Sequence, residues 1–195
     1  VFLIFFAVVM GVHYSALSWR FKKTFLLVAS YVFYGAWNPP FALLLVLSTV
    51  MDWFLAAWIG RTGAASKRRA LITVSLVVNL GLLAFFKYGT FLLSNFVLML
   101  GALGITYVPP APSIILPVGI SFYTFQTLSY TLDVYTGRDR PWTSFLDFAL
   151  YVTFFPQLVA GPIVRSGDFL PQCERPRRAG GDEIGWGFAL ILFGL

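Results

Sequence analysis

The polar side chains between residues 116 and 135, in LPVGISFYTFQTLSYTLDVY, could bind and orient a substrate. On a helix, which turns about 100° per residue, four of them fall on one face that spans about 100°: Gln126, Ser129, Tyr130 and Asp133. This face carries an amide, two hydroxyls and a carboxylate, so it can both donate and accept hydrogen bonds. A helix surrounded by lipid would not carry such a face, so we expect it to point toward other helices or into a watery cavity.

A second candidate is Asp52, in the middle of the apolar run FALLLVLSTVMDWFLAAWIG. A carboxylate at the centre of a membrane costs roughly 2.5–3.5 kcal/mol on insertion scales. We therefore expect it to be paired, protonated or facing water. Two interpretations stay open: a buried carboxylate that satisfies a neighbouring helix, and a functional group.

The stretch FFPQLVAGPIVR, residues 154–165, interrupts an otherwise apolar run. Pro156 removes a backbone donor and ends or kinks a helix, and Gly161 with Pro162 then favours a tight exit before Arg165. Irregular backbone at membrane depth is tolerated only where protein or water covers it. The break therefore suits a cavity wall or a re-entrant element, or else an ordinary helix end with Arg165 among lipid headgroups.

Signatures of soluble enzymes are missing from the sequence, which has no P-loop, G-x-G-x-x-G, H-E-x-x-H, paired C-x-x-C or G-x-S-x-G. The single histidine, His13, and the single cysteine, Cys173, lie far apart, so no metal site is predicted. We interpret His13 as an interfacial or hydrogen-bonded residue, Cys173 as a plain loop residue and Lys87 as a side chain that snorkels to the interface.

The composition predicts a protein that has lipid as its main solvent. Of 195 residues, 58% are hydrophobic and only 11% are charged, and the mean hydropathy is +0.80. Trp and Tyr residues gather near the ends of apolar runs, as amphipathic rings do at a membrane boundary. The net charge of +6 lies in short loops between these runs and forms no patch with interleaved aromatics, so nucleic acid is not an expected partner.

The apolar runs predict an all-α, polytopic bundle of transmembrane helices: 1–17, 24–37, 41–60, 70–86, 89–105, 114–135, 143–164 and 186–195. If every run crosses, most Lys and Arg share one side, predicted to be cytoplasmic, and Lys87, Arg138 and Arg140 lie on the other. If 89–105 lies on the surface instead, everything after it inverts and the asymmetry weakens. We favour the first threading, which puts the amino end outside.

The ends of the sequence favour a piece of a longer chain. It begins without Met inside an apolar run and stops about ten residues into another, whereas a membrane span needs about twenty. No repeat or low-complexity tract marks a second domain, so residues 1–195 are predicted to form a single membrane domain.

Four stretches make the sequence similar to the membrane-bound O-acyltransferases, and to their bacterial alginate O-acetylation branch in particular. These are ASYVFYGAW (29–37), NLGLLAFFKYGTF (79–91), ILPVGISFYTFQTLSYTLDVYTG (115–137) and FFPQLVAGPIVRSGDFLPQ (154–172). With their spacing they extend over nearly the whole sequence, which resembles the amino-terminal part of such a protein.

This resemblance implies a many-helix acyltransferase of the bacterial inner membrane, with funnels from both faces that meet at a thin floor. It implies that an acyl group, acetyl in the alginate branch, passes from a cytoplasmic thioester such as acetyl-CoA toward a cell-surface polysaccharide or an extracytoplasmic acetyltransferase partner. No covalently bound cofactor is implied. The lipid bilayer is the remaining expected partner.

The family's catalytic histidine lies in the later half of its sequence, and no position of residues 1–195 matches it. Thioester chemistry needs a general base, usually an imidazole. We therefore expect the catalytic residues downstream of Leu195, none among residues 1–195, and no activity from this chain alone. The resemblance instead implies scaffold and cavity wall, with Gln126 and Asp133 from one segment and Arg165 and Asp168 from the other.

Two other classes remain as alternatives. A transporter or flippase would also have broken helices and buried carboxylates, although the inverted repeats typical of transporters are absent from the sequence. A non-catalytic assembly partner is the third. The acceptor polysaccharide is not specified by any residue.

Overall fold

A computed structural model describes residues 1–195 except 110–113, 159–160, 177–178 and 195. The described residues are helical and contain no strand, which confirms the predicted all-α class. The helices are α1 (Phe2–Tyr14), α2 (Trp19–Gly35), α3 (Pro39–Arg61), α4 (Ala65–Ala102), α5 (Ile120–Thr136), α6 (Phe145–Thr153), α7 (Phe155–Leu158), α8 (Ser166–Glu174) and α9 (Gly181–Gly194).

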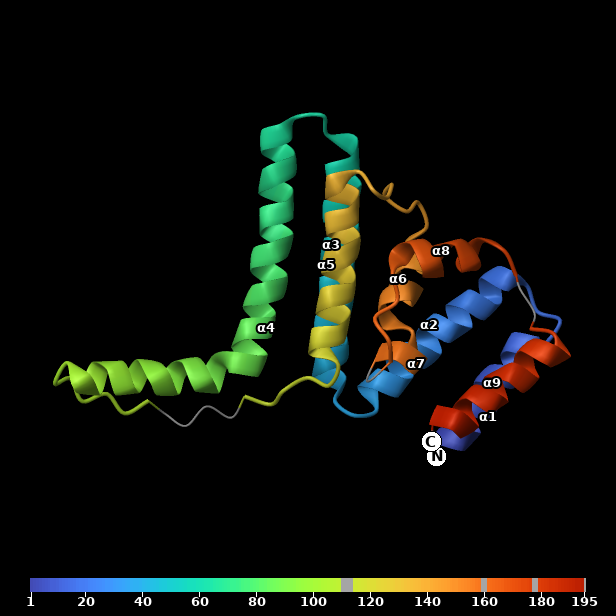
Figure 1. The fold of residues 1–195 in the computed structure, drawn as a ribbon, viewed down its shortest axis with the longest axis horizontal. Helices are drawn as coiled ribbons and strands as arrows, with labels where there is room; N and C mark the ends of the chain where they lie inside the picture. The colour runs from blue at the N-terminus through green and yellow to red at the C-terminus, as the bar shows by residue number, and fades with distance from the viewer. Residues whose placement is uncertain (110–113, 159–160, 177–178, 195) are drawn as a thin grey trace.

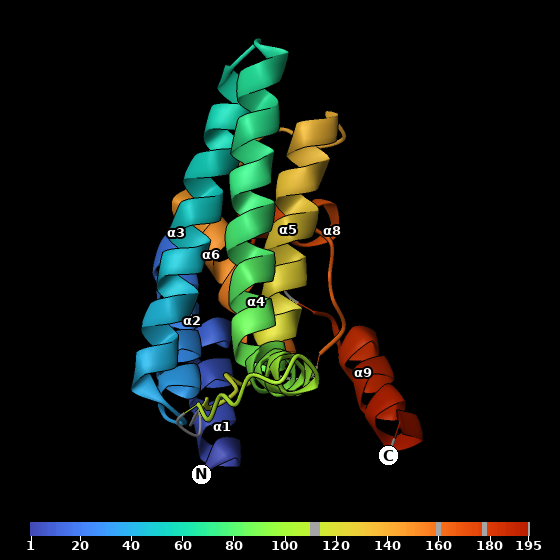
Figure 2. The ribbon, with the colours of Figure 1, turned by 90° about the vertical axis from the view of Figure 1, so that its left-hand side faces the viewer.

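The centre of the fold is a layer in which α3, the first part of α4, and α5 pack against one another (Figures 1 and 2). Helix α3 begins at Pro39, where the missing N–H of proline is harmless, and its 23 residues extend for about 34 Å. That length suffices for a hydrocarbon core of about 30 Å. Among the described helices, α3 and α4 are long and apolar enough to cross a membrane.

Helix α4 is a single helix of 38 residues that changes direction along its course. Its first part runs beside α3 and α5, and its latter part, which holds most of the run 89–105, turns aside and extends away from the bundle (Figure 1). Figure 2 shows this latter part nearly end-on. The threading in which 89–105 returns across the membrane as its own helix is therefore wrong. The segment continues α4, so the hydrogen bonds of the helix satisfy its backbone N–H and C=O groups.

Residues 143–164 also do not cross as one helix. Helix α6 has nine residues, about 14 Å, and the four-residue α7 follows after a break at Phe154. After α7 the chain returns to the loop that precedes α6. The evidence is a hydrogen bond between the two ends of this segment: the Ser166 hydroxyl donates to Asp139 Oδ2 at 2.8 Å. Segment α6–α7 is thus a re-entrant hairpin. Both threadings of the sequence had counted 143–164 as a crossing.

All described Lys and Arg except Lys87 lie in or next to four parts of the fold that this return joins into one connected set, which we call the basic end. It comprises the α1–α2 turn, the α3–α4 turn, the α5–α6 loop and α8. Direct contacts hold these parts together: Trp19 Nε1 donates to the Cys173 carbonyl at 2.7 Å, and Arg68 donates to the Tyr135 carbonyl at 2.5 Å. Arg138 and Arg140, which we expected on the opposite side, lie here.

The buried core joins α2, α3, α5 and α6. Tyr130 and Phe148 are at most 1% exposed, and their ring centroids are 4.7 Å apart. A smaller cluster of Val9, Ala29 and Phe155 connects α1 and α2 to α7. Large apolar side chains also cover the outside of α3 and α4, as expected where lipid rather than water surrounds a helix.

Candidate functional site

The break between α6 and α7 leaves backbone groups that side chains from other helices satisfy. In an unbroken helix the Phe155 N–H would bond to the Tyr151 carbonyl. Here the Phe155 N–H donates instead to Ser30 Oγ of α2 at 3.2 Å. The freed Tyr151 carbonyl accepts from Gln126 Nε2 of α5 at 2.7 Å and from Gln157 Nε2 of α7 at 2.9 Å.

Both glutamines are buried, Gln126 at 3% and Gln157 at 6% exposure. Since an unsatisfied buried carbonyl costs about 1–3 kcal/mol, two amide donors make this irregular backbone tolerable at depth. Gly161 closes the turn, because a Cβ at that position would overlap Gln157 Cα. Gln126 could be predicted from its helical face, whereas Gln157 and Ser30 were not predicted; for Gln157, proximity to Pro156 was the available signal.

The Tyr151 side chain fixes the segment that leaves the hairpin and leads to α8. Its hydroxyl donates to the Val164 carbonyl at 3.1 Å, and its ring packs against Phe169 of α8 at 5.7 Å between centroids. The residue is fully buried. Tyr151 therefore joins the entering helix, the exit segment and α8 into one unit.

Three of the four polar residues predicted to share a face of α5 lie at the contact with α6 and its preceding loop. Besides Gln126, the Ser129 hydroxyl donates to the Gln126 carbonyl at 3.0 Å, and the Tyr130 hydroxyl accepts from the Trp142 N–H at 2.8 Å. Asp133 lies further along, where its side chain is 20% exposed and 3.7 Å from Arg138. It marks the basic end of α5.

Asp52 is fully buried between α3 and α4, and it lines none of the cavities described below. Ser75 Oγ donates to its Oδ1 at 2.7 Å, and Asn79 Nδ2 lies 3.1 and 2.9 Å from its two oxygens. Ser48 donates to the Asn79 amide oxygen at 3.3 Å. Of the two interpretations left open, this geometry favours the carboxyl that satisfies a neighbouring helix.

Arg165 and Asp168 are exposed at the start of α8, and neither is among the described hydrogen-bond partners of Gln126. Arg165 occupies the N-cap position, and Asp168 lies in the first turn, where its charge complements the helix dipole. Their placement gives α8 a polar outer face at the basic end.

A cavity of about 210 Å³ lies directly beside Pro156. Its walls come from α1, α2 and the α6–α7 break, and include Phe6, Val9 and Phe155. A second cavity of about 440 Å³ shares His13, Tyr14, Leu26 and Phe154 with it and continues to Trp19, Gln172 and Cys173. Together they follow the hairpin from its apolar tip to the basic end.

His13 lines both cavities, and its ring contacts those of Tyr14 and Trp19 at 5.4 and 6.1 Å. Groups of three or more His, Cys, Asp or Glu that could hold a metal ion do not occur among the described residues. The described part of the chain therefore offers two adjoining cavities with one imidazole and hydrogen-bonding groups in their walls.

The position of the catalytic residues, expected downstream of Leu195, stays a prediction. Leu195 itself lies outside the described residues, which reach Gly194 at the end of α9. The location of the general base and the role of residues 1–195 as cavity wall therefore both stay predictions.

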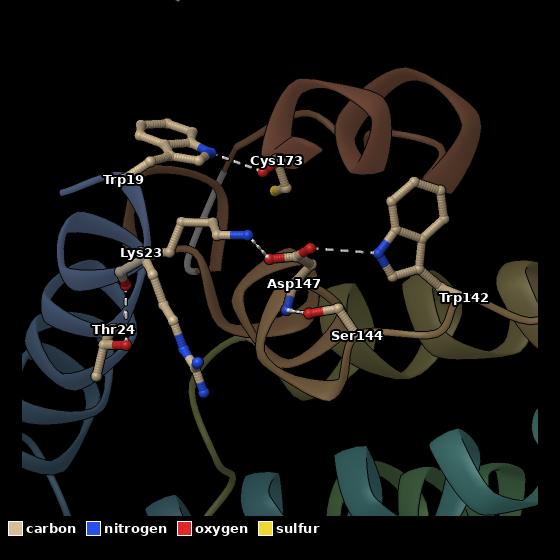
Figure 3. Close-up of polar contacts among 8 residues, drawn as sticks. Trp19, Lys23, Thr24, Trp142, Ser144, Asp147 and Cys173 are labelled. Atoms are coloured by element: carbon tan, nitrogen blue, oxygen red, sulfur yellow. Dashed lines mark hydrogen bonds and ion pairs between the residues drawn. The ribbon is translucent and has the colours of Figure 1, made fainter. Parts of the chain in front are cut away.

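The entrance of the hairpin is anchored by a buried ion pair that sequence reasoning did not find. Lys23 of α2 pairs with Asp147, whose other carboxylate oxygen accepts from Trp142 Nε1 at 3.4 Å (Figure 3). Ser144 caps α6 by accepting from the Asp147 N–H at 3.3 Å. The spacing of Ser144 and Asp147, which resembles a capping box, was the one signal available.

Comparison with curated proteins gives relatives that are O-acetyltransferases by name. The chain is 39% identical over 171 residues to the probable alginate O-acetylase AlgI of Pseudomonas aeruginosa, covering 87% of this chain and 32% of that protein. It is 35% identical over 170 residues to the AlgI of Azotobacter vinelandii, covering 87% and 34%. It is 38% identical over 176 residues to the peptidoglycan O-acetyltransferase of Helicobacter pylori, covering 78% and 32%.

These relatives confirm the resemblance noted in the sequence. The chain spans about a third of the length of the curated relatives it matches. No family model and no solved structure matches it. The resemblance thus rests on sequence alone, and the structure adds the geometry of the broken hairpin.

Proposed function

We infer that the chain belongs to the membrane-bound O-acyltransferases, as part of an O-acetyltransferase related to the alginate and peptidoglycan enzymes it matches. We propose that residues 1–195 form one membrane domain, the amino-terminal part of an enzyme that moves an acetyl group from a cytoplasmic thioester to a polysaccharide hydroxyl. The observation that carries this proposal is the re-entrant hairpin with a cavity beside Pro156.

Acetyl transfer requires a hydroxyl oxygen to attack the thioester carbonyl while a base takes the hydroxyl proton. The C–S bond then breaks, and the thiolate leaves with its electron pair and takes up a proton. Both substrates must therefore meet where water is scarce, because water would compete as the nucleophile. A hairpin that enters and leaves from one side makes a thin floor of that kind.

The roles proposed for the described residues are structural. Gln126 and Gln157 hold the floor at the Tyr151 carbonyl, and Ser129 and Tyr130 fix α5 against it. We assign Asp133, Arg165 and Asp168 to the polar surface at the entrance of the site, on the basic end. The general base belongs to a histidine elsewhere in the whole enzyme, as the resemblance implies.

The basic end supports an orientation with that end in the cytoplasm and the start of α1 on the other side. This matches the side from which an acyl thioester such as acetyl-CoA would arrive. We propose the inner membrane of a bacterium as the location, with several crossings. The acceptor is then a polysaccharide, or a partner acetyltransferase, on the outer side.

The test uses membrane vesicles that contain the full-length protein, with labelled acetyl-CoA on the basic side and alginate oligosaccharides on the other. The expected result is ester-linked acetyl on the oligosaccharide together with an equal amount of free coenzyme A thiol. Movement of oligosaccharide across the membrane without ester formation would support the transporter alternative instead.

The chain of residues 1–195 alone, reconstituted in the same vesicles, is expected to form no ester above the rate of empty vesicles, because its one imidazole does not match the family's base. Ester formation by this chain would overturn that assignment. The full-length protein measured in parallel is the positive control.

A further inference from the structure

The turn between α3 and α4 carries four positive charges, from Arg61, Lys67, Arg68 and Arg69, and no acidic residue occurs between 53 and 132. Arg68 is occupied: it donates to the Tyr135 carbonyl and lies over the Tyr135 ring at 5.7 Å. Arg61 and Lys67 form no ion pair with any described residue. Their charge is therefore not compensated within the described part of the chain.

Arg61 and Lys67 both line a cleft of about 460 Å³, whose other walls are Trp58, Thr62, Ala70 and Leu71. Trp58 is 52% exposed, and its ring centroid lies 6.2 Å from that of Phe54. The cleft thus combines two cations with an accessible indole, which can donate its N–H and stack against an apolar group.

The residues next to the cleft repeat at helical spacing on both helices. Phe54, Trp58 and Arg61 lie on one stripe of α3, and Lys67, Leu71 and Val74 lie on one stripe of α4. On each stripe the cation is nearest the turn and the exposed apolar side chain is furthest from it. The site therefore changes from charged to apolar along the direction of the helices.

This gradient matches one class of molecule in a membrane: a lipid with a negative headgroup above two acyl chains. A free phosphate would use the cations but not the apolar stripes, and a zwitterionic lipid would bring a positive group to a site that has no acid. We propose that the cleft of Trp58, Arg61 and Lys67 binds an anionic phospholipid, with its phosphate between the two cations.

The other cations of the basic end are either paired with an acidic residue or lie outside the cleft. Lys23 is paired with Asp147, and Arg138 lies 3.7 Å from Asp133. Arg20 and Arg69 are exposed but do not line the cleft. They provide a matched control, because replacing them removes the same charge from the same end.

The test is native mass spectrometry of the full chain in mild detergent, with equal amounts of dioleoyl phosphatidylglycerol and dioleoyl phosphatidylcholine. We expect preferential retention of phosphatidylglycerol. The double variant Arg61→Gln, Lys67→Gln should weaken its binding about twenty-five-fold, since each cation near a membrane surface contributes roughly a factor of five. The control variant Arg20→Gln, Arg69→Gln should change it less than about threefold.

Two further measurements test whether the indole and the acyl chains contribute to binding, or the charge alone. Trp58→Ala removes the indole without changing charge, and it should weaken phosphatidylglycerol binding while leaving helix content by circular dichroism unchanged. Glycerol phosphate, which has the headgroup charge and no acyl chains, should not compete at equal concentration. The proposal is overturned by equal losses in the two double variants, by no preference between the two lipids, or by full competition from glycerol phosphate.

Discussion

Asp52 shows at the level of one residue how a membrane helix accommodates a carboxyl group. Its oxygens accept from Ser75 and Asn79, so that removing it leaves two donors in an apolar interior. We expect Asp52→Ala to destabilise the chain by about 1–3 kcal/mol, and Asp52→Asn, which keeps an acceptor oxygen, by less. The measurement is the thermal unfolding midpoint in detergent, followed by tryptophan fluorescence.

Asp168→Ala is the control for this series, because Asp168 is exposed and its removal should cost less than about 1 kcal/mol, the contribution of its charge to the dipole of α8. In the full-length enzyme, Asp52→Asn should retain acetyl transfer within about twofold per folded molecule. A stable Asp52→Asn protein that has lost its activity would contradict the structural role and revive the functional interpretation.

Cys173 differs from the plain loop residue predicted from its sequence context. It lies buried on α8 at the basic end, outside the spanning helices, and its carbonyl holds Trp19. Burial raises the pKa of the Cys173 thiol to about 12, with nearby Asp147 adding to the rise and Lys23 opposing it. The reactive thiolate is therefore scarce at neutral pH.

We expect maleimide to label Cys173 at pH 8 roughly a thousandfold more slowly in the folded chain than after unfolding in detergent. Because the folded pKa is raised, the contribution of this thiol to stability is complete below the unfolded pKa of about 8.5 and is lost as the pH rises toward 12. Mass spectrometry of the labelled chain measures the rate. Equal labelling rates before and after unfolding would show that the thiol is accessible.

The α6–α7 hairpin is the element on which the proposed site depends, and the Tyr151 carbonyl is its weakest point. Gln126→Ala and Gln157→Ala each leave one donor there, so each should cost about 1 kcal/mol. The double variant leaves the carbonyl unsatisfied and should cost about 1 kcal/mol more than the sum. For a chain of this size, 1 kcal/mol corresponds to about 2–4 °C in the unfolding midpoint.

Gln172→Ala serves as the matched control for the hairpin series. Gln172 also donates its amide to a backbone carbonyl, that of Asp168 at 2.7 Å, but on the exposed surface of α8. Its replacement should shift the midpoint by less than about 1 °C. If the double variant at 126 and 157 unfolded at the same temperature as Gln172→Ala, the two glutamines would not support the break.

The sequence predicts the helices better than it predicts their course. Helix type, the start of α3 at Pro39 and an interruption close to Pro156, which the structure puts at Phe154, follow from local rules for proline and apolar spacing. The direction of the latter part of α4 does not, because an apolar run has the same composition whether it crosses or lies aside. Likewise 143–164 is long enough to span as a run, and only its division into α6 and α7 shows that it turns back.

Site residues divide in the same way. The face of α5 could be predicted from helical periodicity, since Gln126 and Tyr130 are separated by one turn. The partners of that face could not, because Tyr151, Gln157 and Ser30 come from three other segments whose approach is decided by packing. Lys23 and Asp147 illustrate this too, since 124 positions in sequence separate the two members of the pair.

At the scale of the whole molecule, the fold gathers its positive charges at one end more completely than the threading of the sequence did. The reason is that 89–105 and 143–164 were each expected to cross once, and neither does so in the structure. The α5–α6 loop and α8 consequently lie on the same side, joined by the bond between Ser166 and Asp139. An experiment on sidedness can therefore decide between the fold and the simple threading.

Single cysteines in a Cys173→Ser background provide this test, at Arg140, Gly167 and Ala102, which are all exposed. A membrane-impermeant maleimide applied to inside-out vesicles should label Arg140→Cys and Gly167→Cys alike, because both positions lie at the basic end, and should leave Ala102→Cys unlabelled. Intact spheroplasts should give the reverse pattern. Labelling of positions 140 and 167 from opposite sides would mean that 143–164 crosses the membrane, and the thin floor beside Pro156 would then not exist.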